Sequence, residues 1–197
     1  MLRDEMFFTK QYPSQMDISF YEKCNQACDY CWTDKSGDSR LTLGQARRAV
    51  DIFLDLPVNE QTITFTTSEP LLCPAVYRGT VDYILKRARS KKVTVVTTTN
   101  GVLLSGELRD FIVERISDTF RLNISLDGMQ KSHDSHRKCA GQRTASAFKL
   151  SWGHFSRLPK DKVRVIMTAS PGESIDLKED VDFILRNGFR KVDLFPR

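Results

Sequence analysis

The chain has 197 residues, of which 40% are hydrophobic and 28% charged, and its net charge is +5. This length and composition fit a globular protein with its own core, and we expect a single domain over residues 1–197. No apolar run approaches the ~20 residues of a membrane span, and the first residues lack the apolar core of a signal peptide. We therefore expect a cytoplasmic protein with no membrane partner.

Six strand-like segments alternate with helical segments along the chain. The strands are predicted over 17–21, 61–66, 92–98, 120–126, 163–168 and 191–195. Helices are predicted from a capping box at Thr42 and Gln45 up to Pro57, and then over 76–90, 108–116, 145–158 and 175–187. This alternation indicates parallel βα units, arranged either as an open doubly wound sheet or as a partial barrel. The sequence stops just after the last strand, so either this is a minimal core or a C-terminal extension is missing.

Polar segments follow four of the predicted strands at the point where each strand ends. They begin at Cys24, at Thr67, at Thr99 and at Ser125, and the run HDSHR follows closely behind the fourth. In parallel βα folds the carboxyl ends of the strands share one rim, and chemistry is concentrated in the loops there. We therefore expect these four segments to meet at one functional site.

Cys24, Cys28 and Cys31 form a C-x3-C-x2-C motif in the first of these loops. Three thiolates this close can bind three corners of one metal centre, whereas closed zinc sites and simple ferredoxin clusters take four protein ligands. The motif therefore favours a four-iron cluster with one iron open to another ligand. The alternative is a zinc site completed by a histidine or by Cys73 or Cys139. The five cysteines are an odd number, which disfavours a disulfide framework and favours a reducing compartment.

With these motifs the chain resembles the radical S-adenosylmethionine (radical SAM) superfamily, and in particular its peptide-modifying, SPASM-type members. The resemblance implies an α/β fold, a partial (β/α)6 barrel of parallel strands. It also implies a [4Fe-4S] cluster held by the three cysteines, with Tyr30 just before the last of them, and S-adenosylmethionine (SAM) bound at the open iron. A one-electron donor such as flavodoxin or ferredoxin would then supply the electron.

The same resemblance implies the residues that contact SAM. The segment Thr67-Ser68-Glu69-Pro70 resembles the family's Gly-Gly-Glu-Pro motif, in which backbone and glutamate hold the SAM amino group. Thr67 and Ser68 replace both glycines, and we expect their side chains to weaken SAM binding because glycine allows close backbone approach. The remaining contacts implied by the resemblance are Asn100 in the third loop, Ser125 and Asp127 in the SLDG pattern, and Arg137 as partner of the SAM carboxylate.

The predicted function is reductive cleavage of SAM to start a radical reaction on an organic substrate. The substrate is expected to be a peptide or protein side chain, with a small molecule as the alternative. A second reading is a non-catalytic iron–sulfur or metal-binding protein on the same scaffold that has lost the use of SAM. Nucleic acid is not an expected partner, because the basic residues are scattered along the chain rather than clustered.

Overall fold

The computed structural model describes residues 12–88, 91–142, 144–169 and 177–196. Within them six parallel strands form one sheet in the order β1-β2-β3-β4-β5-β6. The strands are β1 (Gln15–Asp17), β2 (Glu60–Phe65), β3 (Lys92–Thr99), β4 (Phe120–Ser125), β5 (Arg164–Ala169) and β6 (Lys191–Pro196). The predicted parallel α/β fold is confirmed, and the sequential strand order is that of a partial barrel.

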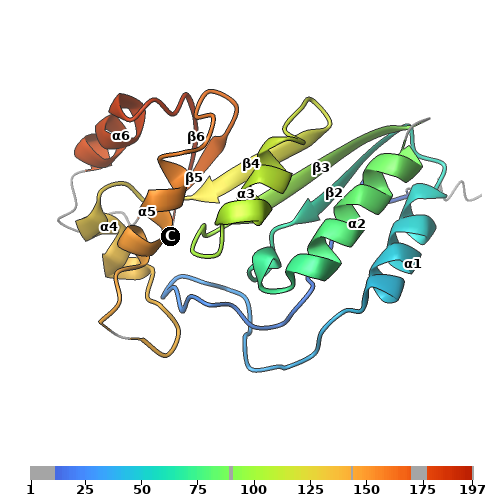
Figure 1. Ribbon diagram of the computed structural model, residues 1–197, viewed down its shortest axis with the longest axis horizontal. Helices are drawn as coiled ribbons and strands as arrows, with labels where there is room; N and C mark the ends of the chain where they lie inside the picture. The colour runs from blue at the N-terminus through green and yellow to red at the C-terminus, as the bar shows by residue number, and fades with distance from the viewer. Residues whose placement is uncertain (1–11, 89–90, 143, 170–176, 197) are drawn as a thin grey trace, which may run out of the picture.

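Helices connect successive strands, as right-handed βα units require. They are α1 (Leu43–Leu54), the 3₁₀ turn η1 (Pro70–Leu72), α2 (Pro74–Arg87), α3 (Gly106–Val113), α4 (Gln130–His136), α5 (Ala147–Phe155) and α6 (Leu177–Arg186). Figure 1 shows α1 and α2 side by side in front of β2 and β3. The predicted capping box begins α1: the Thr42 hydroxyl accepts from the Gln45 N–H at 3.2 Å, and the Gln45 side chain accepts from the Thr42 N–H at 2.9 Å.

Two local predictions differ from the structure. The first strand was expected over 17–21, but the ladder with β2 runs over Gln15–Asp17. Ile18 and Phe20 lie beyond the end of β1 but are buried in the core. Their apolar side chains extend the alternating sequence pattern past the strand, which explains the difference. Helix α4 was not predicted, since its sequence has no apolar helical pattern. It instead buries Ser132, His133 and His136, which are polar.

The two faces of the sheet differ in polarity. Alternate side chains on one face are apolar and buried beneath the helices, as expected for strands covered by βα crossovers. These residues are Ile63, Phe65, Val93, Val95, Leu122, Ile124, Val165 and Met167. Toward the carboxyl ends, the opposite face carries Thr98, Asn123, Ser125 and Thr168, which line a cavity. Because side chains alternate along each strand, the apolar ones reach the core on one face and the polar ones line the cavity on the other.

Aromatic side chains tie the helical layer to the first strands. The rings of Phe20 and Phe65 lie 5.0 Å apart, and Tyr77 of α2 meets Phe65 edge-on at 5.7 Å. The Tyr77 hydroxyl is hydrogen-bonded to Thr97 of β3 at 2.9 Å, so this buried ring keeps a polar partner. The segment that precedes the cysteines is thereby packed directly on the core.

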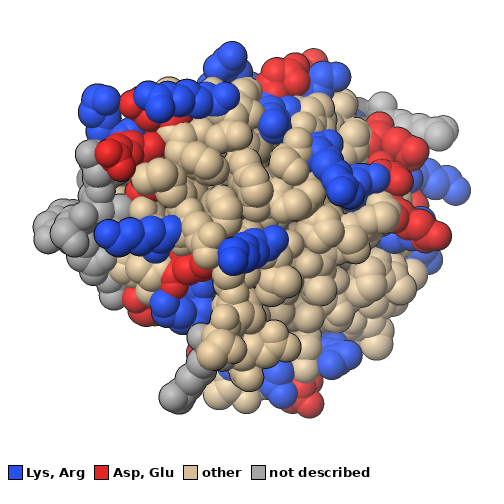
Figure 2. Space-filling model, turned by 60° about the vertical axis from the view of Figure 1, so that its left-hand side comes forward, with Lys and Arg blue, Asp and Glu red and all other residues tan. Residues whose placement is uncertain are grey.

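Charges on the surface are mixed in sign. On the face in Figure 2, Lys and Arg atoms are scattered among acidic and neutral atoms rather than gathered in one patch. Among the described residues, no helix has the length and apolar character needed to cross a membrane.

Gly101 at the end of β3 offers a test of the packing. Its φ is +77°, and a Cβ added there would lie 2.1 Å from the buried Phe155 ring. We expect Gly101→Ala to lower the free energy of unfolding by at least about 2 kcal/mol, from backbone strain plus overpacking. Gly153 in α5 is the matched control, because nothing lies within 4 Å of its added Cβ. Gly153→Ala should stabilise the protein by about 0.5–1 kcal/mol in the same urea titration. Equal effects of the two substitutions would contradict this packing.

Candidate functional site: the cysteine loop and the cavity at the strand ends

A cavity of about 620 Å³ opens at the carboxyl ends of the strands. It joins residues from loops that are far apart in the sequence, as the predicted alignment at one rim requires. Of the residues predicted for the site, the cavity is lined by Cys24, Cys28, Tyr30, Cys31, Ser68, Glu69, Asn100, Ser125 and Arg137. Thr67 and Asp127 lie outside this lining and have other contacts.

The cysteine loop is held in place by the segment that follows α4. The Ala27 N–H donates to the Lys138 carbonyl at 2.7 Å, and the Asp29 N–H donates to the His136 carbonyl at 3.1 Å. In the opposite direction, the Ala140 N–H donates to the Asn25 carbonyl at 2.9 Å. This short antiparallel pairing positions the backbone of the cysteine loop through protein contacts.

The three cysteines are free and partly buried. Burial raises the pKa of Cys24 to about 11 and also raises the pKa of Cys28. Burial acts in the same direction on Cys31, but hydrogen bonds from Thr33 and the charge of Lys35 outweigh it, and its pKa is lowered. The surroundings therefore favour the thiolate, the form in which cysteine binds metals, at Cys31, whereas burial favours the thiol at Cys24 and Cys28.

A zinc ion and a four-iron cluster place different requirements on the three cysteines. Among the described residues, no group of three Cys, His, Asp or Glu side chains could hold a single metal ion. A zinc ion requires its ligands to converge on one point. A four-iron cluster instead attaches each thiolate to a different iron. The three cysteines of the loop line the cavity at the rim, where a cluster held by them would face the polar groups of the other loops.

Glu69 joins the second and third loops. Its carboxylate is 2% exposed and accepts hydrogen bonds from the Leu71 N–H at 3.1 Å, the Thr99 hydroxyl at 2.8 Å and the Asn100 N–H at 2.8 Å. Burial raises the pKa of Glu69 to about 7, although its three donors favour the ionised form. The carboxylate therefore connects the start of η1 to the end of β3.

Asn100 extends this set of hydrogen bonds to the cysteine loop. Its side-chain N–H donates to the Asn25 side-chain oxygen at 2.7 Å, and the same nitrogen lies 3.7 Å from the Cys24 sulfur. The Asn100 side-chain oxygen accepts from the Val102 N–H at 3.1 Å, which closes the turn. Glu69 and Asn100 thus link three loops in one hydrogen-bonded chain.

Thr67 and Ser68 have separate roles. The Thr67 hydroxyl donates to the Asp17 carboxylate at the end of β1, which also accepts from the Thr66 hydroxyl at 2.8 Å. The Thr67 side chain is thereby bound to the neighbouring strand. Ser68 lines the cavity with a φ of +61°, the left-handed region that favours glycine. The backbone therefore keeps a conformation typical of glycine although a side chain is present.

Asp127 and Arg137 form a buried ion pair. The Arg137 Nε donates to Asp127 at 2.6 Å and its Nη2 donates at 3.0 Å; the Arg137 side chain is 7% exposed and the Asp127 side chain 2%. The Tyr30 hydroxyl at 2.7 Å and the Thr168 N–H at 2.9 Å also donate to Asp127. Burial opposes ionisation of Asp127, but the Arg137 charge outweighs it and the pKa of Asp127 is lowered.

His133 supports this pair from α4. Its Nδ1 accepts a hydrogen bond from the Asp127 N–H at 3.3 Å. Burial and the nearby Arg137 charge lower the pKa of His133 to about 4, so the ring is neutral near pH 7. These contacts agree with a residue that orders the loop.

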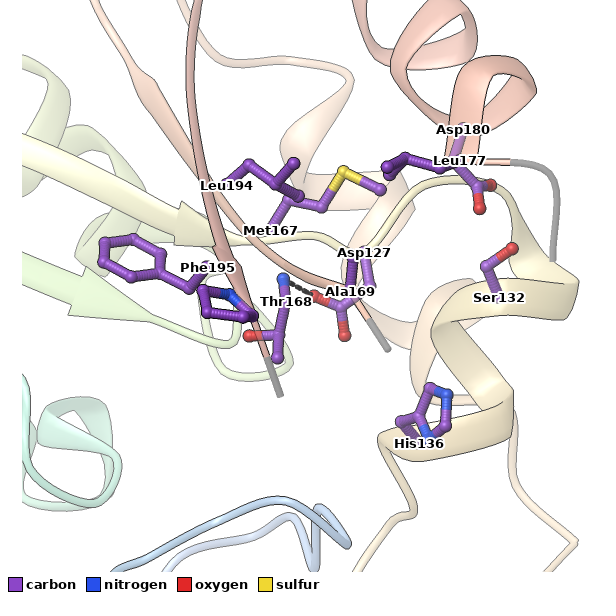
Figure 3. A pocket seen from close by; sticks show the side chains of 11 residues that line it. Asp127, Ser132, His136, Met167, Thr168, Ala169, Leu177, Asp180, Leu194 and Phe195 are labelled. Carbon is purple, nitrogen blue, oxygen red and sulfur yellow. Dashed lines mark hydrogen bonds between the residues drawn. The ribbon is translucent and has the colours of Figure 1, made fainter. Parts of the chain in front are cut away.

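A second cavity of about 300 Å³ lies beside the first. Figure 3 shows Asp127 among the lining residues, bonded to the Thr168 backbone, with Met167, Leu177 and Leu194 together on one side of it. Thr168 and Phe195 line both cavities, so the two spaces adjoin. Apart from Asp127, the residues that line this second cavity were not among the predicted site residues. The alternation of the fifth strand, which places Thr168 on the same face as Ile166, could have indicated them.

The family of the chain follows from comparison with known proteins. The model of the Radical SAM superfamily matches residues 18–184. The chain belongs to the radical SAM superfamily. Superfamily members use a [4Fe-4S] cluster and SAM, the two cofactors expected from the cysteine motif. The predicted family, fold and cofactors are thus confirmed, and the family supports an enzyme.

Individual relatives come from several branches of the radical SAM superfamily. The chain is 28% identical over 124 residues to the serine-type anaerobic sulfatase-maturating enzyme of Bacteroides thetaiotaomicron, covering 58% of this chain and 29% of that protein. It is 32% identical over 132 residues to a probable GTP 3′,8-cyclase of Methanocella arvoryzae, covering 66% of this chain and 39% of that protein.

A solved structure, native anSMEcpe with bound AdoMet and the Cp18Cys peptide, has the same fold. Its TM-score is 0.74 at 17% identity, covering 92% of this chain and 50% of that chain. This radical SAM chain therefore spans half or less of the length of each of these three relatives.

We expect two Arg→Lys substitutions to differ in their effect on the free energy of unfolding, because one alters a buried ion pair and the other an exposed one. Arg137→Lys keeps the charge but loses the two-bond geometry inside a buried site, and should lower the free energy of unfolding by about 1–3 kcal/mol. Arg164→Lys is the control, because the Arg164–Asp193 side chains are 40% and 36% exposed. It should cost less than about 1 kcal/mol. Anaerobic urea unfolding of both variants measures the difference, and equal costs would argue against a structural role for the buried pair.

Proposed function

We propose that this chain carries the catalytic core of an enzyme that cleaves SAM reductively and starts a radical reaction on a peptide side chain. The observation that carries the proposal is the shared cavity, which joins three thiols to polar groups from four strand ends. When bound, the cluster supplies the electron that splits SAM into methionine and a 5′-deoxyadenosyl radical, which takes hydrogen from the substrate. The protein contributes binding, orientation and shielding.

The chain's own residues would divide these tasks. Cys24, Cys28 and Cys31 would hold the cluster, and the backbone of the Ser68-Glu69 segment would face the SAM amino group. Ser125 at the end of β4 and the Arg137 guanidinium also line the cavity, where they would meet a carboxylate. In this proposal Glu69 acts mainly through position, because its oxygens already bind protein donors.

A peptide substrate is supported by two comparisons. The sulfatase-maturating relative acts on a protein, as its name states, and the anSMEcpe structure contains a bound peptide. The second cavity adjoins the first and is lined mainly by apolar side chains, among them Met167, Leu177 and Leu194. An apolar space next to the SAM site suits an amino-acid side chain.

A small-molecule substrate is the second candidate, because the GTP 3′,8-cyclase relative is the more identical of the two curated proteins compared. Anaerobic turnover separates the candidates. The reduced enzyme is incubated with SAM and either a cysteine- or serine-containing peptide library or GTP. An increase in 5′-deoxyadenosine above the substrate-free rate with peptides alone supports the proposal, and an increase with GTP alone favours the second candidate.

The cysteines provide the first test. Replacing Cys24, Cys28 and Cys31 together by alanine should abolish iron and sulfide loading and the broad visible absorbance of the reconstituted protein, because all three protein ligands are lost. Cys73→Ala and Cys139→Ala are the controls and should load iron like wild type. Loss of iron in the Cys73 variant would identify a fourth protein ligand and count against SAM binding at an open iron.

The Thr67-Ser68 segment provides the second test. We expect the Thr67→Gly/Ser68→Gly variant to bind SAM more tightly, by up to about tenfold if one hydrogen bond worth ~1 kcal/mol improves. Glu69→Ala should nearly abolish binding, because the second and third loops lose their connection. Anaerobic calorimetric titration of SAM into cluster-loaded protein measures both effects. No binding in wild type or in either variant would instead indicate the non-catalytic cluster protein.

A further inference from the structure

Gln26 lies between the first two cysteines of the motif and faces the cavity. Its side chain is 1% exposed, and Gln26 lines the same space as Cys24 and Cys28. Its Nε2 is buried and has no hydrogen-bond partner among the residues that the structure describes. A buried amide N–H without a partner is costly, so such a group calls for an explanation.

The backbone of Gln26 is fixed from several sides. It pairs with Cys139 in an antiparallel bridge, and its carbonyl accepts from the Lys35 Nζ at 2.9 Å. Its N–H donates to the Cys24 sulfur at 3.4 Å. The side chain therefore starts from a well-defined position beside two sulfurs.

The side-chain amide of Gln26 contacts the Cys28 sulfur. The Cys28 thiol donates to the Gln26 Oε1 at 3.7 Å. A cysteine bound to iron is a thiolate and has no proton to donate. The same contact would then place an amide oxygen against a negatively charged sulfur, which is repulsive.

A half-turn of the amide removes this conflict. Rotation about the last side-chain torsion exchanges Oε1 and Nε2 with little change of shape. Nε2 then lies against the Cys28 sulfur as a donor, and it gives up no bond, since it has none in the described part of the chain. Oε1 loses its thiol donor in any case once Cys28 binds iron. The rotated amide therefore gives Nε2 an acceptor and removes the repulsion between Oε1 and the Cys28 thiolate.

We propose that Gln26 donates its side-chain N–H to the Cys28 sulfur of the cluster and thereby makes the cluster easier to reduce. Hydrogen bonds to cluster sulfurs are among the factors that set the potential, because they stabilise the more negative reduced state. Gln26 is thus a tuning residue for the one-electron step. This inference rests on the proposed function, because it requires a cluster on the three cysteines.

Gln26→Leu tests the bond, because leucine fills similar space without a donor. We expect the midpoint potential to fall by about 30–60 mV, which corresponds to a three- to tenfold change in the one-electron equilibrium constant. The potential is measured by electron paramagnetic resonance during a redox titration of reconstituted protein. Gln61→Leu is the control: Gln61 is also buried, but its Nε2 donates to the Phe53 carbonyl at 2.6 Å. It should destabilise the fold and leave the potential unchanged.

A second readout detects the hydrogen itself. Pulsed resonance of the reduced cluster in D₂O should show one exchangeable deuteron coupling in wild type that is missing in Gln26→Leu, while the coupling from the Gln26 backbone N–H on the Cys24 sulfur remains. Gln26→Met has a similar volume, no charge and no N–H donor, so it serves as the test variant if the leucine variant does not hold iron. An unchanged potential and deuteron signal in a loaded variant would overturn the role of Gln26 alone. Failure of wild type to form any cluster would overturn the proposed function as well.

Discussion

The carboxylate of Asp127 is buried, and its need for hydrogen-bond donors constrains the positions of several segments at the rim. A buried charge is tolerated only when it is paired and its oxygens are hydrogen-bonded. The donors come from the cysteine loop (Tyr30), the end of α4 (Arg137) and β5 (Thr168), while Asp127 itself follows β4. Four segments distant in sequence are thereby held at fixed distances. A shift of any one of them would remove a hydrogen-bond donor or the counter-charge from the buried carboxylate, which is costly.

A second polar connection does the same on the other side of the cavity. Glu69 binds the second loop to the third, and Asn100 continues to Asn25 beside Cys24. The two connections meet the cysteine loop near its two ends, at Asn25 and at Tyr30. The loop is also paired with the segment after α4. The thiols are thus pre-organised, which lowers the conformational cost of binding a cofactor.

Thr67 and Ser68 are accommodated in the second loop in different ways. The Thr67 side chain is bound by Asp17 from the neighbouring strand, and it does not line the cavity. Ser68 adopts a positive φ that favours glycine and therefore carries some backbone strain. Gln26 is a comparable case on the cysteine loop, where a polar side chain is buried against a sulfur.

The sequence by itself determined the order of strands and helices, the metal-binding motif and the rim at which the loops meet. These features depend on local periodicity, on the spacing of Cys24, Cys28 and Cys31, and on the geometry of parallel βα units. Tertiary structure alone decided the partners of polar side chains. Arg137 is paired with Asp127, 10 residues away, and Asp127 in turn accepts from the Thr168 N–H, 41 residues away from it. Helix α4 likewise forms without an apolar pattern, because its buried histidines are stabilised by contacts that periodicity does not encode.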